Sequence, residues 1–281
     1  MLEGMNRHYY LLVISSLFGA FGSARAVGAA ETPQRESKTK LVENARTVLD
    51  ALVKSAEENR RLPERDAPGA SAPFHRTGDD LTVYYVRAAA TAARQLPEHE
   101  GASAFLLALG IGLDETSLLR SNPISGGLWR KVEPEEARKR RVAVLGSPTL
   151  HGRHDLAQHF SVSAGLTAAL GAPAAESAGL LKEMLDARGG SGFSFADLSA
   201  DYAGIAFARR LLDKPSRLAD VERRFRIGDY AISPRGLPEG LNAEQFEKRY
   251  GSLQDDRFKR LQADIRKRID GLPGYCDTDK K

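Results

Sequence analysis

The sequence predicts a mainly α-helical fold, an orthogonal or bundle-like single domain of several helices with long loops and a C-terminal amphipathic helix. Along most of the chain, apolar residues recur at steps of three and four, the spacing of one helix face. Glycine and proline stand where these stretches stop, as they do at helix ends. The only cysteine is Cys276, so no intramolecular disulfide can form and the fold must depend on its hydrophobic core.

Residues 1–30 have the pattern of a signal peptide. Arg7 and His8 precede an apolar run at 9–21, and small residues follow it. The run is short for a membrane-spanning helix, although an uncleaved N-terminal anchor is the alternative. Residues 31–43 are polar and lack an apolar period, so we expect a flexible arm there. These features predict an exported protein of the periplasm or cell envelope.

Residues 44–145 are expected to form an N-terminal helical region. A first amphipathic helix is indicated from Leu41 to Leu62, and a second at 80–94 is closed by Pro97. A third, at 101–113, is apolar on nearly every side and should therefore lie at the centre of the core. A basic helical turn at 134–141 leads into a β-branched stretch at 142–150, which indicates a short extended segment.

Residues 146–213 are expected to form a unit of three helices, at 155–170, 173–188 and 194–212. Ser194 and Asp197 form an S-x-x-D capping box at the start of the third. Small residues spaced by four predict that helix backbones approach closely; they are Gly165, Ala169, Ala200, Gly204 and Ala208.

Residues 214–281 hold a loop followed by an amphipathic helix that begins at Asn242, with Gln245 three residues on. The polar face of this helix carries both signs of charge. We therefore expect it to pack on the same core rather than lie on a membrane.

The decapeptide HGRHDLAQHF at 151–160 opens the three-helix unit with three of the six histidines. Asp155 and His159 are four apart and share a helix face, while His154 lies on an adjacent face. A carboxylate beside an imidazole orients and charges the histidine for proton transfer or metal binding. His154 and His159 point about 140 degrees apart on an ideal helix, so they cannot both be ligands of one ion.

The second and third helices add charged residues that could converge on His159 if the three helices pack together. The candidate polar site consists of His154, Asp155, His159, Lys182, Glu183, Asp186, Asp197 and Asp201. The candidate ligands of a divalent metal ion are Asp155, His159, Glu183 and Asp201. Structural alternatives stay open: Lys182 and Asp186 could form a surface ion pair, and Asp197 could reach back to the backbone of Ser194.

Several site classes lack support in the sequence. The H-x-x-D-x-x-x-H spacing differs from the zinc motif H-E-x-x-H, and neither a G-x-S-x-G elbow nor a P-loop occurs. The net charge of +4 is small and of mixed sign, which argues against a nucleic-acid partner. After the first 30 residues no apolar stretch reaches the roughly twenty residues of a spanning helix.

The ordered series HDLAQHFSVSAGLTAAL and GLLKEMLDARGGSGFSFADLSADYAG resembles the YfiM-like family of predicted bacterial periplasmic proteins over about residues 151–210. The matching residues are Gly179, Lys182, Glu183, Asp186, Ser194, Asp197, Asp201 and Gly204. The resemblance implies export and a helical unit, and it implies no activity. The long N-terminal region, the C-terminal extension and the absence of a lipid-attachment cysteine depart from the family.

Two hypotheses of function follow. The first is an exported envelope protein with a structural or ligand-binding role, and the second is a metal-dependent hydrolase with a His/Asp/Glu site on three packed helices. A divalent metal ion is the only cofactor that the residues suggest. Envelope proteins or peripheral membrane contact are the possible partners, whereas the substrate and the oligomeric state have no signal in the sequence.

Overall fold

Helices make up the regular structure of this chain, and they confirm the mainly α prediction. The computed structural model describes residues 31–64, 73–116, 118–121 and 125–276, and within them no strand occurs, only isolated bridges such as that between Phe193 and Leu241. The helices are α2 (Glu31–Arg60), α3 (Gly78–Ala93), α4 (Glu98–Gly112), α5 (Leu118–Ser121), α6 (Gly126–Val132), α7 (Glu135–Val144), α8 (His154–Leu170), α9 (Ala172–Asp186), α10 (Phe195–Asp213), α11 (Leu218–Arg224), α12 (Ile227–Tyr230), α13 (Ala243–Tyr250) and α14 (Asp256–Asp270).

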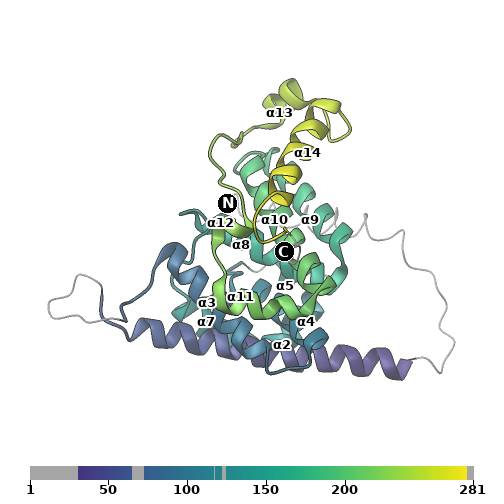
Figure 1. Ribbon diagram of the computed structural model, residues 1–281. Helices are drawn as coiled ribbons and strands as arrows, with labels where there is room; N and C mark the ends of the chain where they lie inside the picture. The colour runs from purple at the N-terminus through teal and green to yellow at the C-terminus, as the bar shows by residue number, and fades with distance from the viewer. Residues whose placement is uncertain (1–30, 65–72, 117, 122–124, 277–281) are drawn as a thin grey trace.

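The apolar helix α4 lies at the centre of the core, as its composition predicts. Every residue from Ala104 to Gly112 is buried, and α4 packs against α2, α3, α8 and α10. Figure 1 shows α2 along one end of the molecule and the pair α13 and α14 at the opposite end. One continuous hydrophobic cluster connects residues of α2 with residues of α14, so the described elements form a single domain.

The long helix α2 corrects the expectation of a flexible arm at 31–43. The helix begins at Glu31 and continues without a break to Arg60. The later turns of the helix contact α4: the Lys40 ammonium lies 2.6 Å from a carboxylate oxygen of Glu100, and the Asn44 amide donates to the other oxygen of Glu100 at 2.9 Å. The absence of an apolar period therefore did not exclude a helix here, because charged residues with good helix propensity extend the amphipathic part.

The prediction of an extended segment at 142–150 is also wrong for its first residues, 142–144, which are helical. Helix α7 continues to Val144, and the residues after it are irregular, with isolated bridges from Pro148 to Gly78 and from Leu150 to Arg153. The reason is Arg141, which is buried and anchors the last turns of α7. Its guanidinium forms two hydrogen bonds with Glu133, at 2.7 and 3.2 Å, and donates to the carbonyls of Gly112 and Asp114, both at 2.9 Å.

The three helices predicted for 146–213 are confirmed as α8, α9 and α10, with α8 packed on both α9 and α10. Close backbone approach is confirmed at two glycines. A Cβ atom on Gly110 of α4 would lie 2.8 Å from Cα of Gly165 on α8. A Cβ atom on Gly204 of α10 would overlap the carbonyl of Phe160 on α8. These contacts fix how near the polar faces of α8 and α10 come to each other.

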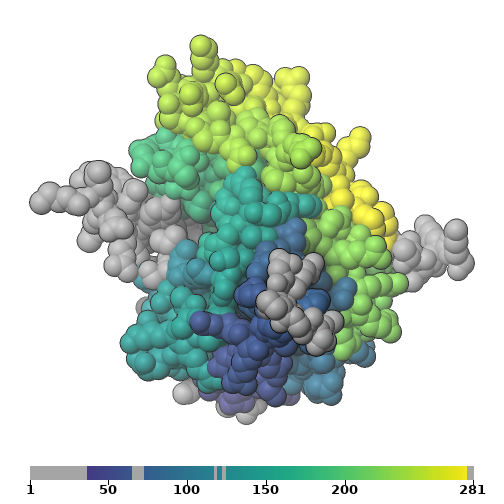
Figure 2. All heavy atoms as spheres, turned by 90° about the vertical axis from the view of Figure 1, so that its left-hand side faces the viewer, coloured from purple at the N-terminus to yellow at the C-terminus, as the bar shows by residue number. Residues whose placement is uncertain are grey.

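The loop expected after residue 214 contains the short helices α11 and α12, and two helices follow Asn242 rather than the one expected. Asn242 caps α13 in a complete capping box with Gln245, but the chain turns at Gly251, which has a positive φ of 68°, and α14 begins after Asp255. Phe246, Phe258 and Ile265 are buried in the common core. Figure 2 shows these C-terminal residues at one end of the molecule, with α2 at the other.

The signal peptide predicted for 1–30 lies outside the described residues. No helix among the described ranges combines the length and the hydropathy that spanning a membrane requires.

Candidate metal centre

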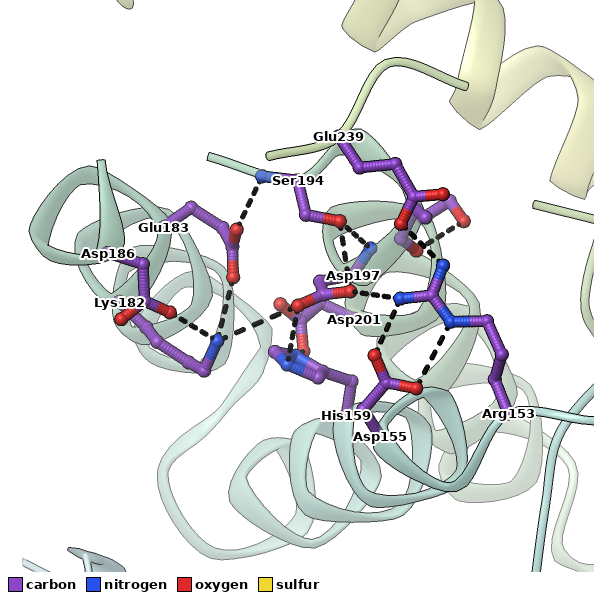
Figure 3. Close-up of polar contacts among 12 residues, drawn as sticks. Arg153, Asp155, His159, Lys182, Glu183, Asp186, Ser194, Asp197, Asp201 and Glu239 are labelled. Carbon is purple, nitrogen blue, oxygen red and sulfur yellow. Dashed lines mark hydrogen bonds and ion pairs between the residues drawn. The ribbon is translucent and has the colours of Figure 1, made fainter. Parts of the chain in front are cut away.

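Charged side chains of α8, α9 and α10 meet at one place near the start of α10 (Figure 3). We define the His159 cluster as His159 of α8, Lys182, Glu183 and Asp186 of α9, and Asp197 and Asp201 of α10. The sequence predicted that these residues converge if the three helices pack together, and the structure brings all six into one network.

The imidazole of His159 lies between two carboxylates. Its Nδ1 is 3.1 Å from Oδ1 of Asp201, and its Nε2 is 3.3 Å from Oδ2 of Asp197. Burial alone would lower the pKa of His159, but the two carboxylates outweigh burial and raise it to about 10. At neutral pH the ring is therefore an imidazolium that donates one hydrogen bond to each aspartate.

Asp201 is the inner partner of His159, and its exposed fraction is only 3 %. The Ser163 hydroxyl donates to Oδ1 of Asp201 at 2.6 Å, so this oxygen serves both Ser163 and His159. The other oxygen, Oδ2, lies against α9 at Gly179, where a Cβ atom would be 2.6 Å away, and it has no hydrogen-bond partner among the described residues. Gly179 thus leaves room for the carboxylate that orients His159.

The Asp197 carboxylate faces the cluster because Glu183 accepts the backbone hydrogen bond that the capping box predicts for Asp197. The Ser194 hydroxyl accepts from the backbone N–H of Asp197 at 3.0 Å, as an N-cap does. In a complete capping box, the Asp197 carboxylate would then accept from the backbone N–H of Ser194. That N–H instead donates to Oε2 of Glu183 at 2.8 Å. The Asp197 carboxylate still accepts from the Ser194 hydroxyl through Oδ1 at 2.9 Å, while its Oδ2 faces His159. Despite burial, the hydrogen bond with His159 lowers the pKa of Asp197 to about 2.

Glu183 is completely buried, whereas the neighbouring Lys182–Asp186 ion pair that the sequence allowed is partly exposed. Its Oε1 lies 3.0 Å from the Lys182 ammonium. Burial, together with the negative charge of Asp197, raises the pKa of Glu183 to about 7 in spite of the nearby cations Lys182 and His159. A carboxyl group with such a pKa is typical of a functional site and less common in a structural ion pair.

Lys182 lies at the outer side of the cluster, with 31 % of its side chain exposed. Its Nζ is 2.8 Å from Oδ2 of Asp186, 3.0 Å from Oε1 of Glu183 and 3.7 Å from Oδ2 of Asp197. Burial would lower the pKa of Lys182, but Glu183 and Asp186 raise it above its ordinary value. The ammonium group therefore bridges all three carboxylates as a permanent cation.

Arg153 forms the opposite rim of the cluster, and the sequence did not single it out. Its guanidinium contacts both oxygens of Asp155, at 3.1 and 2.6 Å, and reaches Oδ1 of Asp197 at 3.3 Å and Glu239 at 2.5 Å. Asp155 is thereby engaged by Arg153, which holds the pKa of Asp155 below its ordinary value against the effect of burial. The position of Arg153 two residues before Asp155 could have indicated the Arg153–Asp155 pair. The contact with Glu239 could not be predicted in this way, because Glu239 lies in a distant loop.

His154 lies outside the cluster. Its Nδ1 is 2.8 Å from the carbonyl oxygen of Pro148, and its Nε2 is 3.5 Å from Glu115. The structure thus separates the two histidines, as the angle between them on a helix predicts. His154 positions the turn before α8 and does not reach His159.

Three side chains of the cluster lie close enough together that they could hold a metal ion. One donor atom each from His159, Glu183 and Asp197 lies within 4.8 Å of the others. The ligand set predicted from the sequence contained His159 and Glu183, but it named Asp155 and Asp201 where the structure has Asp197. Asp155 is drawn to Arg153, and Asp201 lies behind His159 at Nδ1. The sequence allowed the Asp197 carboxylate to bond to the backbone N–H of Ser194 in the helix cap, but this N–H donates to Glu183 instead.

No protein-family model matches the chain, and no curated protein or solved structure is similar to it. Membership in the YfiM-like family therefore stays a prediction.

Proposed function

We propose that this protein is an exported helical envelope protein whose three-helix unit binds a divalent cation. The observation that carries the proposal is the spacing of the donor atoms of His159, Glu183 and Asp197, which all lie within 4.8 Å of one another. One imidazole and two carboxylates form a donor set that suits Zn²⁺, Mn²⁺ or Fe²⁺. The signal-like residues 1–30 and the resemblance to predicted periplasmic proteins support the proposed location.

The size of the site fits an ion of this class. Ligands that each lie about 2.1 Å from one metal ion are about 3.4 Å apart in a tetrahedral arrangement. Closing the present separation of up to 4.8 Å therefore needs side-chain shifts of about an ångström. Rotation of the Asp197 and Glu183 side chains would supply this shift.

The charge of the cluster also favours a divalent cation. Within the described residues, Glu183, Asp186, Asp197 and Asp201 are paired with three cationic groups, His159, Lys182 and Arg153. The rim adds the carboxylates of Asp155 and Glu239, so acids still outnumber bases. Charges that are buried without compensation cost several kcal/mol each, and a dication would reduce this cost.

Asp201 supports coordination without being a ligand itself. It accepts a hydrogen bond from Nδ1 of His159, and this bond directs Nε2 toward Asp197. Coordination would require Nε2 to release its proton to solvent, so metal binding should weaken as the pH falls. A carboxylate on the far nitrogen of a ligating histidine fixes the tautomer and the ring orientation. Ser163 and Gly179 hold that carboxylate in place.

We favour binding over the alternative, metal-dependent hydrolysis, because access is limited. The side chains of His159 and Asp197 are each 10 % exposed, and that of Glu183 is not exposed. A hydrolase needs room for a substrate beside the metal and its water. The rim groups Arg153 and Lys182 cover the approach from two sides (Figure 3).

The test is metal binding by the purified full-length protein, measured for Zn²⁺ and Mn²⁺ by calorimetry and by thermal unfolding with and without chelator. We expect one ion per chain and a melting temperature several degrees higher with the ion. Asp197→Asn removes one ligand and should weaken binding at least about tenfold. Asp264→Asn, on the exposed side of α14, is the matched control and should bind as the wild type does.

Two results would contradict the proposal. Wild-type protein that binds neither ion would end it. Equal affinity of Asp197→Asn and wild type would place any bound ion elsewhere. Turnover of ester or phosphoester substrates by the metal-loaded protein would instead favour the hydrolase.

A further inference from the structure

Lys182 already occupies the side of the cluster on which a metal ion would bind. Its ammonium lies 3.0 Å from Glu183 and 3.7 Å from Oδ2 of Asp197, and these two carboxylates belong to the candidate metal ligands. In Figure 3 the side chain reaches toward Asp197 from the side opposite Arg153. No other cationic side chain among the described residues is paired with both carboxylates.

We propose that the Lys182 ammonium and a divalent cation occupy this position in turn, so that the site works by cation exchange. This inference rests on the proposed metal binding and adds how binding is regulated. A dication bound to Asp197 and Glu183 would lie within a few ångströms of the ammonium. Like charges at such a distance repel strongly in a partly buried site. Entry of the metal therefore requires that Lys182 leave.

Asp186 gives the displaced ammonium a place to go. It lies one turn further along α9, its Oδ2 is 2.8 Å from Nζ of Lys182, and it is not one of the three candidate ligands. Lysine has a flexible four-carbon side chain, and here 31 % of it is exposed. Rotation about its side-chain bonds moves the ammonium away from Glu183 and Asp197 while Asp186 remains its partner. Neither α9 nor the buried carboxylates need to shift.

Arg153 is not equivalent to Lys182. It contacts Asp197 through Oδ1, whereas Lys182 and His159 are on the Oδ2 side. Asp155 and Glu239 also hold the guanidinium from outside the cluster. Arg153 can therefore stay in place when the metal binds. The metal ion displaces the Lys182 ammonium and the proton on Nε2 of His159, which is released to solvent.

Exchange has a measurable consequence for affinity. Lys182 stabilises the metal-free cluster, so wild-type protein must give up these ion pairs before it binds the ion. Removing the ammonium should raise metal affinity, although it removes a residue of the site. A lysine that only supported the ligands would have the opposite effect, because losing it would weaken binding.

The experiment compares Zn²⁺ and Mn²⁺ titrations of metal-free wild type, Lys182→Met and Lys182→Ala. Both variants should bind the ions about tenfold more tightly than the wild type. Alanine has no donor atom, so the same gain in both variants excludes a new ligand from methionine. Lys259→Met, on the exposed face of α14, is the control and should leave affinity unchanged. Circular dichroism checks that each variant is folded.

Asp186→Asn provides a second, independent measurement. In wild type it removes the alternative partner of the displaced ammonium, so metal affinity should fall several-fold. In the Lys182→Ala background no ammonium has to move, and the same change should have less effect. Equal effects in the two backgrounds would overturn the role of Asp186 in the exchange.

The outcomes separate the exchange from metal binding itself. If wild type binds the ion and both Lys182 variants bind it equally or more weakly, the exchange is wrong and metal binding stands. If only the Lys182 variants bind, the exchange is supported and the proposed function of the wild-type chain fails. If no protein binds, both fail.

Discussion

Two buried ionic networks in this molecule differ in how their charges are balanced. In the Arg141 cluster, made of Arg141, Glu133, Arg120 and Glu135, Glu133 faces two guanidinium groups and Arg141 is also bonded to two backbone carbonyls. In the His159 cluster the carboxylates are in excess, and Oδ2 of Asp201 has no hydrogen-bond partner among the described residues. Balanced pairing is what a purely structural network needs, whereas the excess of acid in the His159 cluster suits a cation.

The groups themselves also differ. An arginine does not lose its charge in proteins, so the guanidinium groups of the Arg141 cluster stay charged at every ordinary pH. The His159 cluster contains a histidine with a pKa of about 10 and a glutamate with a pKa of about 7. One network therefore joins α4 and α7 permanently, while the other can change its protonation or exchange its cation. This difference can be tested in five ways, in order of decreasing effect.

The largest effect should come from breaking the Arg141 cluster. Glu133→Gln leaves the buried guanidinium of Arg141 without its countercharge and should destabilise the protein by about 3–5 kcal/mol. Chemical denaturation measures this loss. If the cluster is only structural, the Glu133→Gln protein that remains folded should still bind Zn²⁺ with wild-type affinity. Loss of metal binding without loss of stability would reverse the roles that we assign to the two clusters.

The His159 cluster should make stability depend on pH in the alkaline range. The pKa of His159 is raised from 6.5 to about 10, so its stabilisation is fully present below pH 6.5 and is lost as the pH rises through 10. Each pKa unit corresponds to about 1.4 kcal/mol, so the loss should amount to a few kcal/mol. Denaturation between pH 6.5 and 10 in the presence of chelator measures it. His159→Gln should remove this slope, and an unchanged slope in the variant would show that His159 does not cause it.

Glu183 should add a slope at lower pH. Its pKa is raised from 4.5 to about 7, so its contribution is fully present below pH 4.5 and is lost as the pH rises through 7. In metal-free protein we expect a loss of about 2–3 kcal/mol over this range, less than the loss linked to His159. Denaturation of wild type and Glu183→Gln between pH 4.5 and 7 tests this, with the prediction that the glutamine variant lacks the slope.

Gly179 should affect stability and metal binding through its contact with the Asp201 carboxylate. A methyl group at this position would lie 2.6 Å from Oδ2 of Asp201 and would push the carboxylate off His159. We expect Gly179→Ala to cost about 1–3 kcal/mol and to weaken metal binding. Gly127→Ala is the control, since nothing lies within 4 Å of its added Cβ atom and alanine favours a helix. Equal stability of the two variants would contradict the tight contact at Gly179.

The smallest effect should come from the outermost ion pair of the His159 cluster. Lys182 and Asp186 are four apart on α9 and partly exposed, and such pairs contribute roughly 0.2–0.5 kcal/mol. Asp186→Asn should therefore change the stability of metal-free protein by less than about 1 kcal/mol. A larger loss in thermal or chemical denaturation would mean that Asp186 belongs to the buried part of the network.

The sequence by itself determined the helical class, the positions of α8, α9 and α10 and the pool of charged residues around His159. These are local properties, because helix period, caps and glycine stops depend on residues a few positions apart. It also determined that His154 and His159 diverge. It underestimated α2, which begins at Glu31 and contacts Glu100 of α4 through Lys40 and Asn44.

Only the tertiary structure decided which of the charged residues face one another. Asp197 is available as a ligand because Glu183, from another helix, bonds to the backbone of Ser194. Asp155 is drawn away by an arginine that also reaches Glu239 in a distant loop. Helix spacing places a side chain on a face but cannot choose between partners on neighbouring helices. That choice depends on how closely the backbones pack, and here the glycines of α8, α9 and α10 set that distance.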